Sequence, residues 1–327
     1  MLLRGDIDDG ERVDAILVTV VQAEAVFNSA LAWRLTVVDA KGDEFTVKVW
    51  HTHDVSRWWC EGWDYVLKQG RGTHRQDGGV VLHTTTDFAA DRPPSVVDLF
   101  AVGDSHIGRE SRPADGNSPY HTARQFVAAM GYAARYGVDA VIHAGDLFDD
   151  DPRLEDLAIA ESGFDILREH GIPYYYVHGN HGVDTAESFY SCLEGMEATH
   201  LATAGDRLGD VDLFGLDYGA ADGIERLADS FAPSADGRHR LLVVHDEIQP
   251  PRPDGIPVET VSPPEARFDC VLCGHLHAPE FGSAFGTDVQ CLGSTAGISA
   301  TQDAADESGW LIRVTPDDVL RTRVSLE

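Results

Sequence analysis

Five short clusters of polar residues recur after residue 100, and they consist of residue types that bind transition metals. In chain order they are Gly103-Asp104-Ser105-His106, Gly145-Asp146, Gly179-Asn180-His181, His245 and Gly274-His275-Leu276-His277. Carboxylate and amide oxygens together with imidazole nitrogens suit Mn, Fe, Zn or Co better than Ca or Cu(I). Two such metals about 3.5–4 Å apart need a bridging anion, and Asp146 is the natural candidate.

Taken singly, each cluster has an ordinary structural interpretation. A lone Gly-Asp or Gly-Asn is usually a turn, and a lone histidine at a strand end is usually a structural residue. Each cluster, however, follows an apolar, strand-like run, and these runs are 96–102, 139–143, 173–178, 241–244 and 269–273. Because α/β sheets bind ligands at the carboxyl ends of their strands, the five clusters together predict one site.

The elements that must position these clusters form an α/β pattern, since helical stretches at 120–136 and 154–170 lie between the strand-like runs. The chain before residue 91 reads as all-β instead. Its apolar runs are 12–27, 31–38, 45–50, 63–68 and 79–83, with a short helix expected at 54–60. A proline-containing break at 91–95 separates the two regions. We therefore expect domains at 1–92 and 93–327.

The composition excludes several classes of protein. No apolar run approaches the ~18–20 residues that a bilayer requires, and the N-terminus has no apolar signal-peptide core. Five cysteines in 327 residues do not form a disulfide framework. Cys270-x-x-Cys273 lacks the second pair of a zinc ribbon, so we expect these two to be buried small hydrophobic residues. A cytoplasmic protein without membrane contact is expected.

The charge is strongly negative, with 55 acids against 25 bases and a net charge of −30. Residues 1–97 hold a net −5 and the remainder −25, and all three lysines lie in the first segment. A solvated acidic surface would give this composition, but so would adaptation to high salt, which we favour. At 1 M salt the Debye length is ~3 Å, so repulsion between these charges would be almost completely screened.

The five clusters resemble those of the calcineurin-like metallophosphoesterase superfamily, over about residues 96–300. The resemblance implies two packed mixed sheets with helices outside, and a metal-dependent hydrolase in which a metal-bound hydroxide attacks phosphorus. It also implies two divalent metal ions, with Mn²⁺ preferred and Fe, Zn or Co as alternatives. The first would be held by Asp104, His106, Asp146 and His277, and the second by Asp146, Asn180, His245 and His275. His181 matches the general acid that protonates the leaving oxygen.

Within the superfamily, residues 103–108 and 143–148 look similar to the SbcD-type exonucleases of double-strand-break repair, and Gly293-Ser294 fits that branch. Three features depart from it. Asp149 stands where many archaeal members have histidine, Gly182 follows His181 where aspartate is usual, and little chain remains for a DNA-capping domain. The domain order also resembles the small subunit of archaeal D-family DNA polymerases, which we rank second.

The first segment resembles an OB-fold, a small barrel that often binds oligonucleotides, because its five strand-like runs have a helix between the third and fourth. A single-strand binder needs exposed aromatic residues beside cations. The candidates are Trp33, Trp50, Trp58, Trp59, Trp63 and Tyr65, with Lys48, Lys68, Arg71 and Arg75 nearby. The alternative is that these aromatic residues fill the barrel core.

These observations predict an OB-like barrel followed by a calcineurin-like two-sheet sandwich flanked by helices. The predicted function is a two-metal phosphodiesterase, a DNA nuclease of the repair type, with DNA and a repair or replication protein as partners. Two rivals stay open at this point. One is a phosphatase or phosphodiesterase acting on nucleotides or small molecules, and the other is a non-catalytic DNA-binding subunit.

Overall fold

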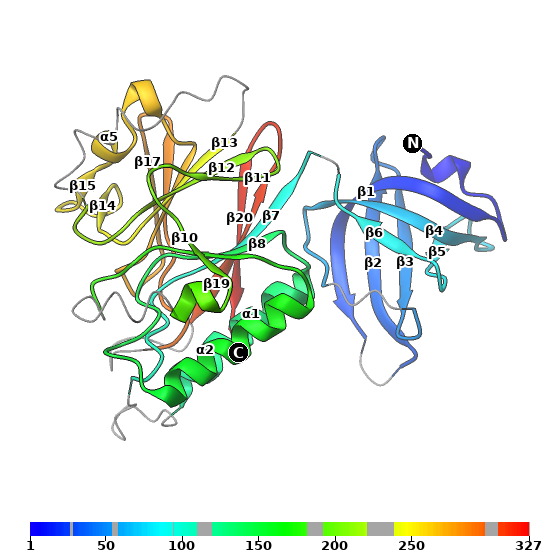
Figure 1. Cartoon of the computed structure of the whole chain (residues 1–327). Coiled ribbons are helices and arrows are strands. Elements are labelled where there is room, and N and C mark those ends of the chain that lie inside the picture. The colour runs from blue at the N-terminus through cyan, green and yellow to red at the C-terminus, as the bar shows by residue number, and fades with distance from the viewer. Residues whose placement is uncertain are drawn as a thin grey trace. The chain divides into compact units, whose positions relative to one another are not determined.

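A computed structural model describes residues 1–26, 29–53, 58–93, 95–109, 120–181, 192–220, 239–297 and 307–326. The chain divides into two compact units, Met1–Pro94 and Ser95–Glu327 (Figure 1). The first unit contains one sheet and the second contains the others, and each unit has its own buried residues.

The first unit is a closed barrel of five strands. They are β1 (Arg12–Ala25), β2 (Leu31–Asp39), β3 (Glu44–Trp50), β4 (Asp64–His74) and β5 (Val80–His83). Their order is β1-β2-β3-β5-β4, and pairing of β1 with β4 closes the barrel. A short strand β6 (Ala89–Asp91) pairs with β4, and a 3-10 turn η1 (Arg4–Asp6) precedes β1. This closed five-stranded barrel fits the OB-like fold that the sequence predicts.

The barrel interior follows from the alternation of apolar and polar residues, because successive side chains of a strand point to opposite faces. Every strand of the barrel contributes fully buried aliphatic side chains, namely Ile16, Leu35, Val47, Leu67 and Leu82. The predicted helix at 54–60 lies mostly outside the described residues, and residues 58–60 form no regular element.

The second unit contains two six-stranded mixed sheets. The first has the order β10-β9-β8-β7-β19-β20, with β7 (Val97–Val102), β8 (Ala140–His143), β9 (Tyr174–Tyr176), β10 (Ala198–His200), β19 (Ser308–Val314) and β20 (Val319–Ser325). The second has the order β11-β12-β13-β16-β18-β17. Its strands are β11 (Asp206–Leu208), β12 (Val211–Leu216), β13 (His239–Val244), β16 (Cys270–Cys273), β17 (Glu280–Ala284) and β18 (Thr287–Cys291).

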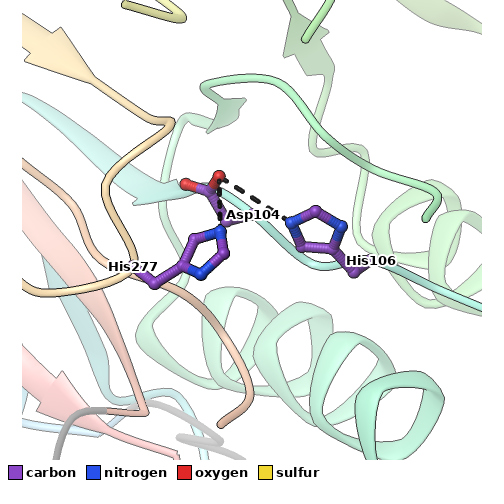
Figure 2. Close-up of side chains that lie close together, drawn as sticks. All are labelled: Asp104, His106 and His277. Atoms are coloured by element: carbon purple, nitrogen blue, oxygen red, sulfur yellow. Dashed lines mark ion pairs between the residues drawn. The ribbon is translucent and has the colours of Figure 1, made fainter. Parts of the chain in front are cut away.

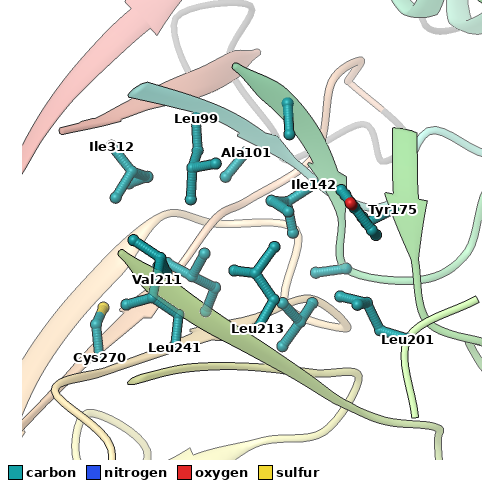
Figure 3. Close-up of a cluster of buried hydrophobic side chains, with 14 of the residues drawn as sticks. Leu99, Ala101, Ile142, Tyr175, Leu201, Val211, Leu213, Leu241, Cys270 and Ile312 are labelled. Atoms are coloured by element: carbon teal, nitrogen blue, oxygen red, sulfur yellow. The ribbon is translucent and has the colours of Figure 1, made fainter. Parts of the chain in front are cut away.

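The two sheets pack face to face around one apolar core (Figure 3). Leu99 and Ile142 from the first sheet meet Leu213 and Leu241 from the second, and all four are fully buried. The helices α1 (His121–Tyr136) and α2 (Leu154–Glu169) pack together. The ring of Phe164 in α2 contacts Tyr174 of β9. This arrangement agrees with the predicted α/β sandwich flanked by helices.

A second apolar cluster lies beside the second sheet and includes residues from the small elements that follow β13. These are β14 (Ile248–Gln249), β15 (Ile256–Pro257), α5 (Val258–Val261) and the 3-10 turn η5 (Pro264–Ala266). Cys270 and Cys273 lie in β16 and are both fully buried. In the described ranges, no helix is long and apolar enough to cross a membrane.

The buried ion pair between Asp98 and Arg313 gives a test of the sandwich. The two residues face each other on β7 and β19, and Arg313 donates from Nε and Nη2 to the two carboxylate oxygens at 2.7 and 2.8 Å. Removing one partner leaves a buried, uncompensated charge. We expect Asp98→Ala to lower the free energy of unfolding by about 3–5 kcal/mol, measured by denaturant titration. Adding Arg313→Met to this variant should restore much of the lost stability. If Asp98→Ala lowers the free energy of unfolding by less than about 1 kcal/mol, the pair contributes no more than an exposed surface pair and the expectation is contradicted.

Candidate metal centre

All eight residues predicted for the site lie together, just beyond the carboxyl ends of strands from both sheets. The first sheet contributes residues after the parallel strands β7, β8 and β9, and the second contributes residues after the parallel strands β13 and β16. The eight residues are Asp104, His106, Asp146, Asn180, His181, His245, His275 and His277. Strands that are distant in the sequence therefore deliver their polar ends to one place.

The backbone turns sharply at these residues. Seven described residues other than glycine have a positive φ, and four of them belong to the site. They are Asp104 at 50°, His106 at 43°, Asp146 at 54° and His275 at 71°. Side chains with a Cβ disfavour this left-handed conformation, which persists only where the surrounding structure enforces it. The turns allow residues two apart, such as Asp104 and His106, to point into the same site.

Two glycines make room for side chains of the site. An added Cβ at Gly179 would lie 1.9 Å from Oδ1 of Asp146. An added Cβ at Gly145, whose φ is +90°, would lie 2.2 Å from Nδ1 of His245. A residue with a Cβ could not lie so close to these side chains. This accounts for the glycine in the Gly145-Asp146 and Gly179-Asn180 pairs of the sequence.

One group of ligand atoms gathers around Asp104, as Figure 2 shows. Nε2 of His277 lies 3.7 Å from Oδ1 of Asp104, and Nε2 of His106 lies 4.0 Å from the same oxygen. Nε2 of His106 is also 3.6 Å from Oδ2 of Asp146. The ligands implied for a first metal are thus within reach of one another.

A second group gathers around Asn180. Its Oδ1 lies 3.0 Å from Nε2 of His245 and 2.9 Å from Nδ1 of His275. Nε2 of His245 lies 3.3 Å from Oδ2 of Asp146. The same carboxylate oxygen therefore faces a histidine of each group, which is the position that a bridging ligand would need.

The electrostatics of the site fit the binding of cations. Burial raises the pKa of Asp104 to about 7, and its Oδ2 has no hydrogen-bond partner within the described part of the chain. Burial also tends to raise the pKa of Asp146, but the hydrogen bond and charge of His245 hold it well below its usual range. A cation would compensate the buried Asp104 carboxylate, and the ionised Asp146 carboxylate offers a negative charge to a second one.

His245 shows how metal binding would be linked to protons. Its Nδ1 donates to the carbonyl oxygen of Ala144 at 2.6 Å, so Nε2 points into the site. Burial tends to lower its pKa, but Asp146 and Asp104 raise the pKa to about 9. Below that pH the imidazole keeps a proton on Nε2, and a metal ion must displace that proton to bind there.

Asp149 contacts two histidines of the site, although the sequence singled it out only as a departure from a family pattern. Its Oδ1 lies 3.0 Å from Nδ1 of His106 and 3.1 Å from Nη1 of Arg109. Its backbone carbonyl oxygen accepts a hydrogen bond from Nδ1 of His181 at 2.6 Å. It thereby orients two histidines of the site, as carboxylates behind metal-binding histidines commonly do. The one sign of this role in the sequence was that Asp149 lies three residues after Asp146.

The fold and the site define a class of protein: a two-sheet α/β domain with clustered metal-binding side chains beyond the strand ends. The sequence pattern of the calcineurin-like phosphoesterases matches residues 98–279, which is more than half of the chain. The chain belongs to the calcineurin-like phosphoesterase family and is a metal-dependent phosphoesterase.

Several curated relatives resemble the chain. It is 31% identical to the DNA double-strand break repair protein Mre11 of Haloferax volcanii, over 69% of this chain and 51% of that protein. It is 32% identical to Mre11 of Methanosarcina mazei, over 63% of this chain and 34% of that protein. The chain thus spans about half or less of these relatives. The crystal structure of TT1561 of Thermus thermophilus matches 71% of this chain and all of that chain, with a TM-score of 0.51 and 12% identity, and supports the fold alone.

Gly179 allows a direct test of the crowding around Asp146. We expect Gly179→Ala to displace the Asp146 carboxylate and to weaken Mn²⁺ binding by at least about tenfold, a free-energy change of about 1.4 kcal/mol. Isothermal titration with MnCl₂ would measure it. Gly131→Ala in α1 is the matched control, because a Cβ there meets no atom within 4 Å. Equal Mn²⁺ affinity in the two variants would contradict the expectation.

Proposed function

We propose that this chain hydrolyses phosphodiester bonds in DNA, using two divalent metal ions with Mn²⁺ preferred. The observation that carries the proposal is the position of Asp146 Oδ2, 3.6 Å from Nε2 of His106 and 3.3 Å from Nε2 of His245. The similarity to double-strand break repair proteins supports DNA as the substrate. When bound, two cations would lower the pKa of an attacking water and offset charge on the non-bridging phosphate oxygens.

His181 is proposed as the general acid. Its Nδ1 donates to the carbonyl oxygen of Asp149, so Nε2 is the nitrogen left to deliver a proton. Its backbone N–H donates to Oδ1 of Asp146 at 2.9 Å, which fixes the residue beside the centre. The side chain is 36% exposed, whereas His106 and His245 are fully buried. An exposed imidazole at this position can reach the leaving oxygen of a bound substrate.

The barrel presents a row of basic side chains that supports a nucleic-acid substrate. Cross-strand pairing places Arg34 of β2 beside Lys48 of β3, Lys48 beside His83 of β5, and His83 beside Arg71 of β4. Directly paired residues project from the same face of a sheet. All four side chains are exposed or half-buried, so the row lies on the outside of the barrel.

The bases of this surface differ in whether they already pair with a carboxylate. Arg34 forms an ion pair with Glu24, and Lys68 forms one with Asp91. Lys48 and Arg71 make no ion pair with a carboxylate in the part of the chain that the structure describes. In a chain with 55 acids, cations without carboxylate partners favour an anionic ligand.

Aromatic residues at this surface are fewer than the sequence suggested. Trp59, Trp63 and Tyr65 are buried and belong to the barrel core. Trp50 is half-buried and stacks on His83, with ring centroids 5.9 Å apart and an interplanar angle of 10°. We propose that Trp50, Lys48 and Arg71 contact a single DNA strand through its bases and phosphates.

The role of His181 can be tested with two leaving groups. We expect His181→Ala to reduce turnover of single-stranded DNA by about 10²–10⁴-fold, the usual range for a positioned general acid. Hydrolysis of bis-p-nitrophenyl phosphate should fall much less, because p-nitrophenolate needs little protonation. Steady-state kinetics with Mn²⁺ on both substrates would measure this. Equal losses would rule out a general acid, and no DNA cleavage by the unmodified chain at low or molar KCl would refute the proposed function.

The basic row can be tested with matched double variants. Lys48→Gln/Arg71→Gln removes two cations without carboxylate partners, and Arg34→Gln/Lys68→Gln removes two that already pair with carboxylates. We expect the first variant to bind single-stranded DNA more weakly, with a log–log salt slope smaller by about 1.4. The control should keep the slope of the unmodified chain, and both should hydrolyse bis-p-nitrophenyl phosphate normally. Fluorescence anisotropy over a KCl series measures the slope, and equal slopes in both variants would exclude this surface.

A further inference from the structure

Tyr218 is an exposed aromatic residue beside the metal centre. It follows β12, which runs parallel to β13, so it lies at the same edge of the second sheet as His245. The centroid of its ring lies 5.5 Å from that of His275 and 6.1 Å from that of His245. Both histidines belong to the ligand group around Asn180. Tyr218 therefore lies at the border of that group.

The backbone of Tyr218 is held in place on two sides. Its N–H donates to the carbonyl oxygen of His178 at 3.0 Å, and the N–H of Ala220 donates to the carbonyl oxygen of Asp217 at 3.1 Å. The Asp217 carboxylate accepts the N–H of His178 at 2.7 Å and lies 2.9 Å from Nε2 of His200. The turn that carries the ring is thus fastened to the first sheet. Such a fixed position reduces the conformational entropy that is lost when a ligand binds.

The side chain of Tyr218 is available to a ligand. The residue is 46% exposed, and in the ranges that the structure describes its hydroxyl group makes no hydrogen bond. A tyrosine that belongs to a core usually has a partner for its hydroxyl group and apolar neighbours on both faces of its ring. Tyr218 instead combines an exposed ring with neighbours that are candidate metal ligands.

The proposed general acid and Tyr218 lie against different ligand groups. The ring of His181 is 4.8 Å from that of His106, which belongs to the group around Asp104. Tyr218 lies against histidines of the group around Asn180. The leaving oxygen of a substrate must face His181 to receive its proton. Tyr218 is consequently placed for the nucleoside on the other side of the phosphorus, which keeps the phosphate.

We propose that Tyr218 stacks on the base of the nucleoside that keeps the phosphate, so that the centre takes an unpaired nucleotide. This inference rests on the proposed phosphodiesterase function. Stacking on an aromatic ring suits any base, because every base has a π-face. It also needs no positive charge, which matters where residues after 97 carry a net charge of −25. A base that stacks on a side chain has left the duplex stack, so single-stranded substrates are favoured.

Two diesters with the same leaving group test the stacking. In thymidine p-nitrophenyl phosphate the group that keeps the phosphate carries a base, whereas in methyl p-nitrophenyl phosphate it does not. Steady-state kinetics with Mn²⁺ gives the ratio of their kcat/KM values, with the 5′ or 3′ thymidine isomer that is cleaved faster. We expect Tyr218→Ala to lower this ratio about tenfold, as for the loss of one base stack. Tyr218→Phe and Tyr218→Trp should keep it, because both retain an aromatic ring.

Phe285→Ala is the matched control and should not change the ratio. Phe285 is 70% exposed and precedes β18, whose parallel pairing with β16 places that end of the strand away from the metal centre. If Tyr218→Ala keeps the ratio of the unmodified chain, the inference is overturned, while cleavage of both diesters leaves the proposed function standing. If Tyr218→Phe loses as much as Tyr218→Ala, the hydroxyl group and not the ring contacts the nucleoside, and stacking is refuted.

Binding without turnover separates the inference from the proposed function. Isothermal titration of the Mn²⁺-loaded protein with thymidine monophosphate and with methyl phosphate measures the contribution of the base directly. We expect the unmodified chain to bind the nucleotide about tenfold more tightly than methyl phosphate, and Tyr218→Ala to bind the two equally. Equal affinities in the unmodified chain would overturn the stacking. A chain that cleaves no diester would refute the proposed function, and this titration would still decide whether Tyr218 binds a base.

Discussion

The structure depends on the burial of two carboxylates and several imidazoles at one point between two sheets. Asp104, His106 and His245 are fully buried there, and Asp146 is 3% exposed. Ionised groups in such a place are destabilising unless opposite charges and hydrogen bonds compensate them. The mutual placement of acids and histidines supplies part of this compensation. Burial nevertheless raises the pKa of Asp104 to about 7, so a cation beside it would stabilise its charged form.

The surrounding fold is arranged to maintain that concentration of polar groups. Parallel strands deliver their carboxyl ends to one edge, and the apolar core between the sheets fixes the strands behind it. Left-handed turns at Asp104, Asp146 and His275 are unfavourable locally, but close packing enforces them. Gly179 is essential for the same reason, because its missing side chain is the space that the Asp146 carboxylate occupies. The strained backbone conformations therefore occur at the same residues that the candidate metal centre uses.

The two units differ in how they would contact the DNA substrate proposed above. Residues after 97 carry a net charge of −25, so cations bound at the candidate centre would be needed to offset the repulsion of a phosphate there. The barrel instead carries Lys48 and Arg71 on its outer surface, next to the stacked Trp50 and His83. Under the proposed function, this division of charge would let an acidic chain bind DNA through its barrel, and high salt would screen the repulsion from the second unit.

The sequence alone determined which residues could form the metal centre and the order of the elements that carry them. The strands before the five clusters and the helices at 120–136 and 154–170 occur within a few residues of their expected bounds, because apolar runs and turn residues are local signals. The strands β10 to β12 and β17 to β20 were not assigned. Among them β10, β11, β17 and β20 lie at sheet edges, where strands with mixed polarity have a weak local pattern. The tertiary structure decided which side chains are buried and which residues from distant parts of the chain lie close together. It buried Trp59 and Trp63 while leaving Trp50 at the surface, because strand register fixes which face each side chain occupies. It also placed Asp149 behind His106 and joined His178, His200 and Asp217, residues whose spacing along the chain gives no sign that three separate strand ends converge.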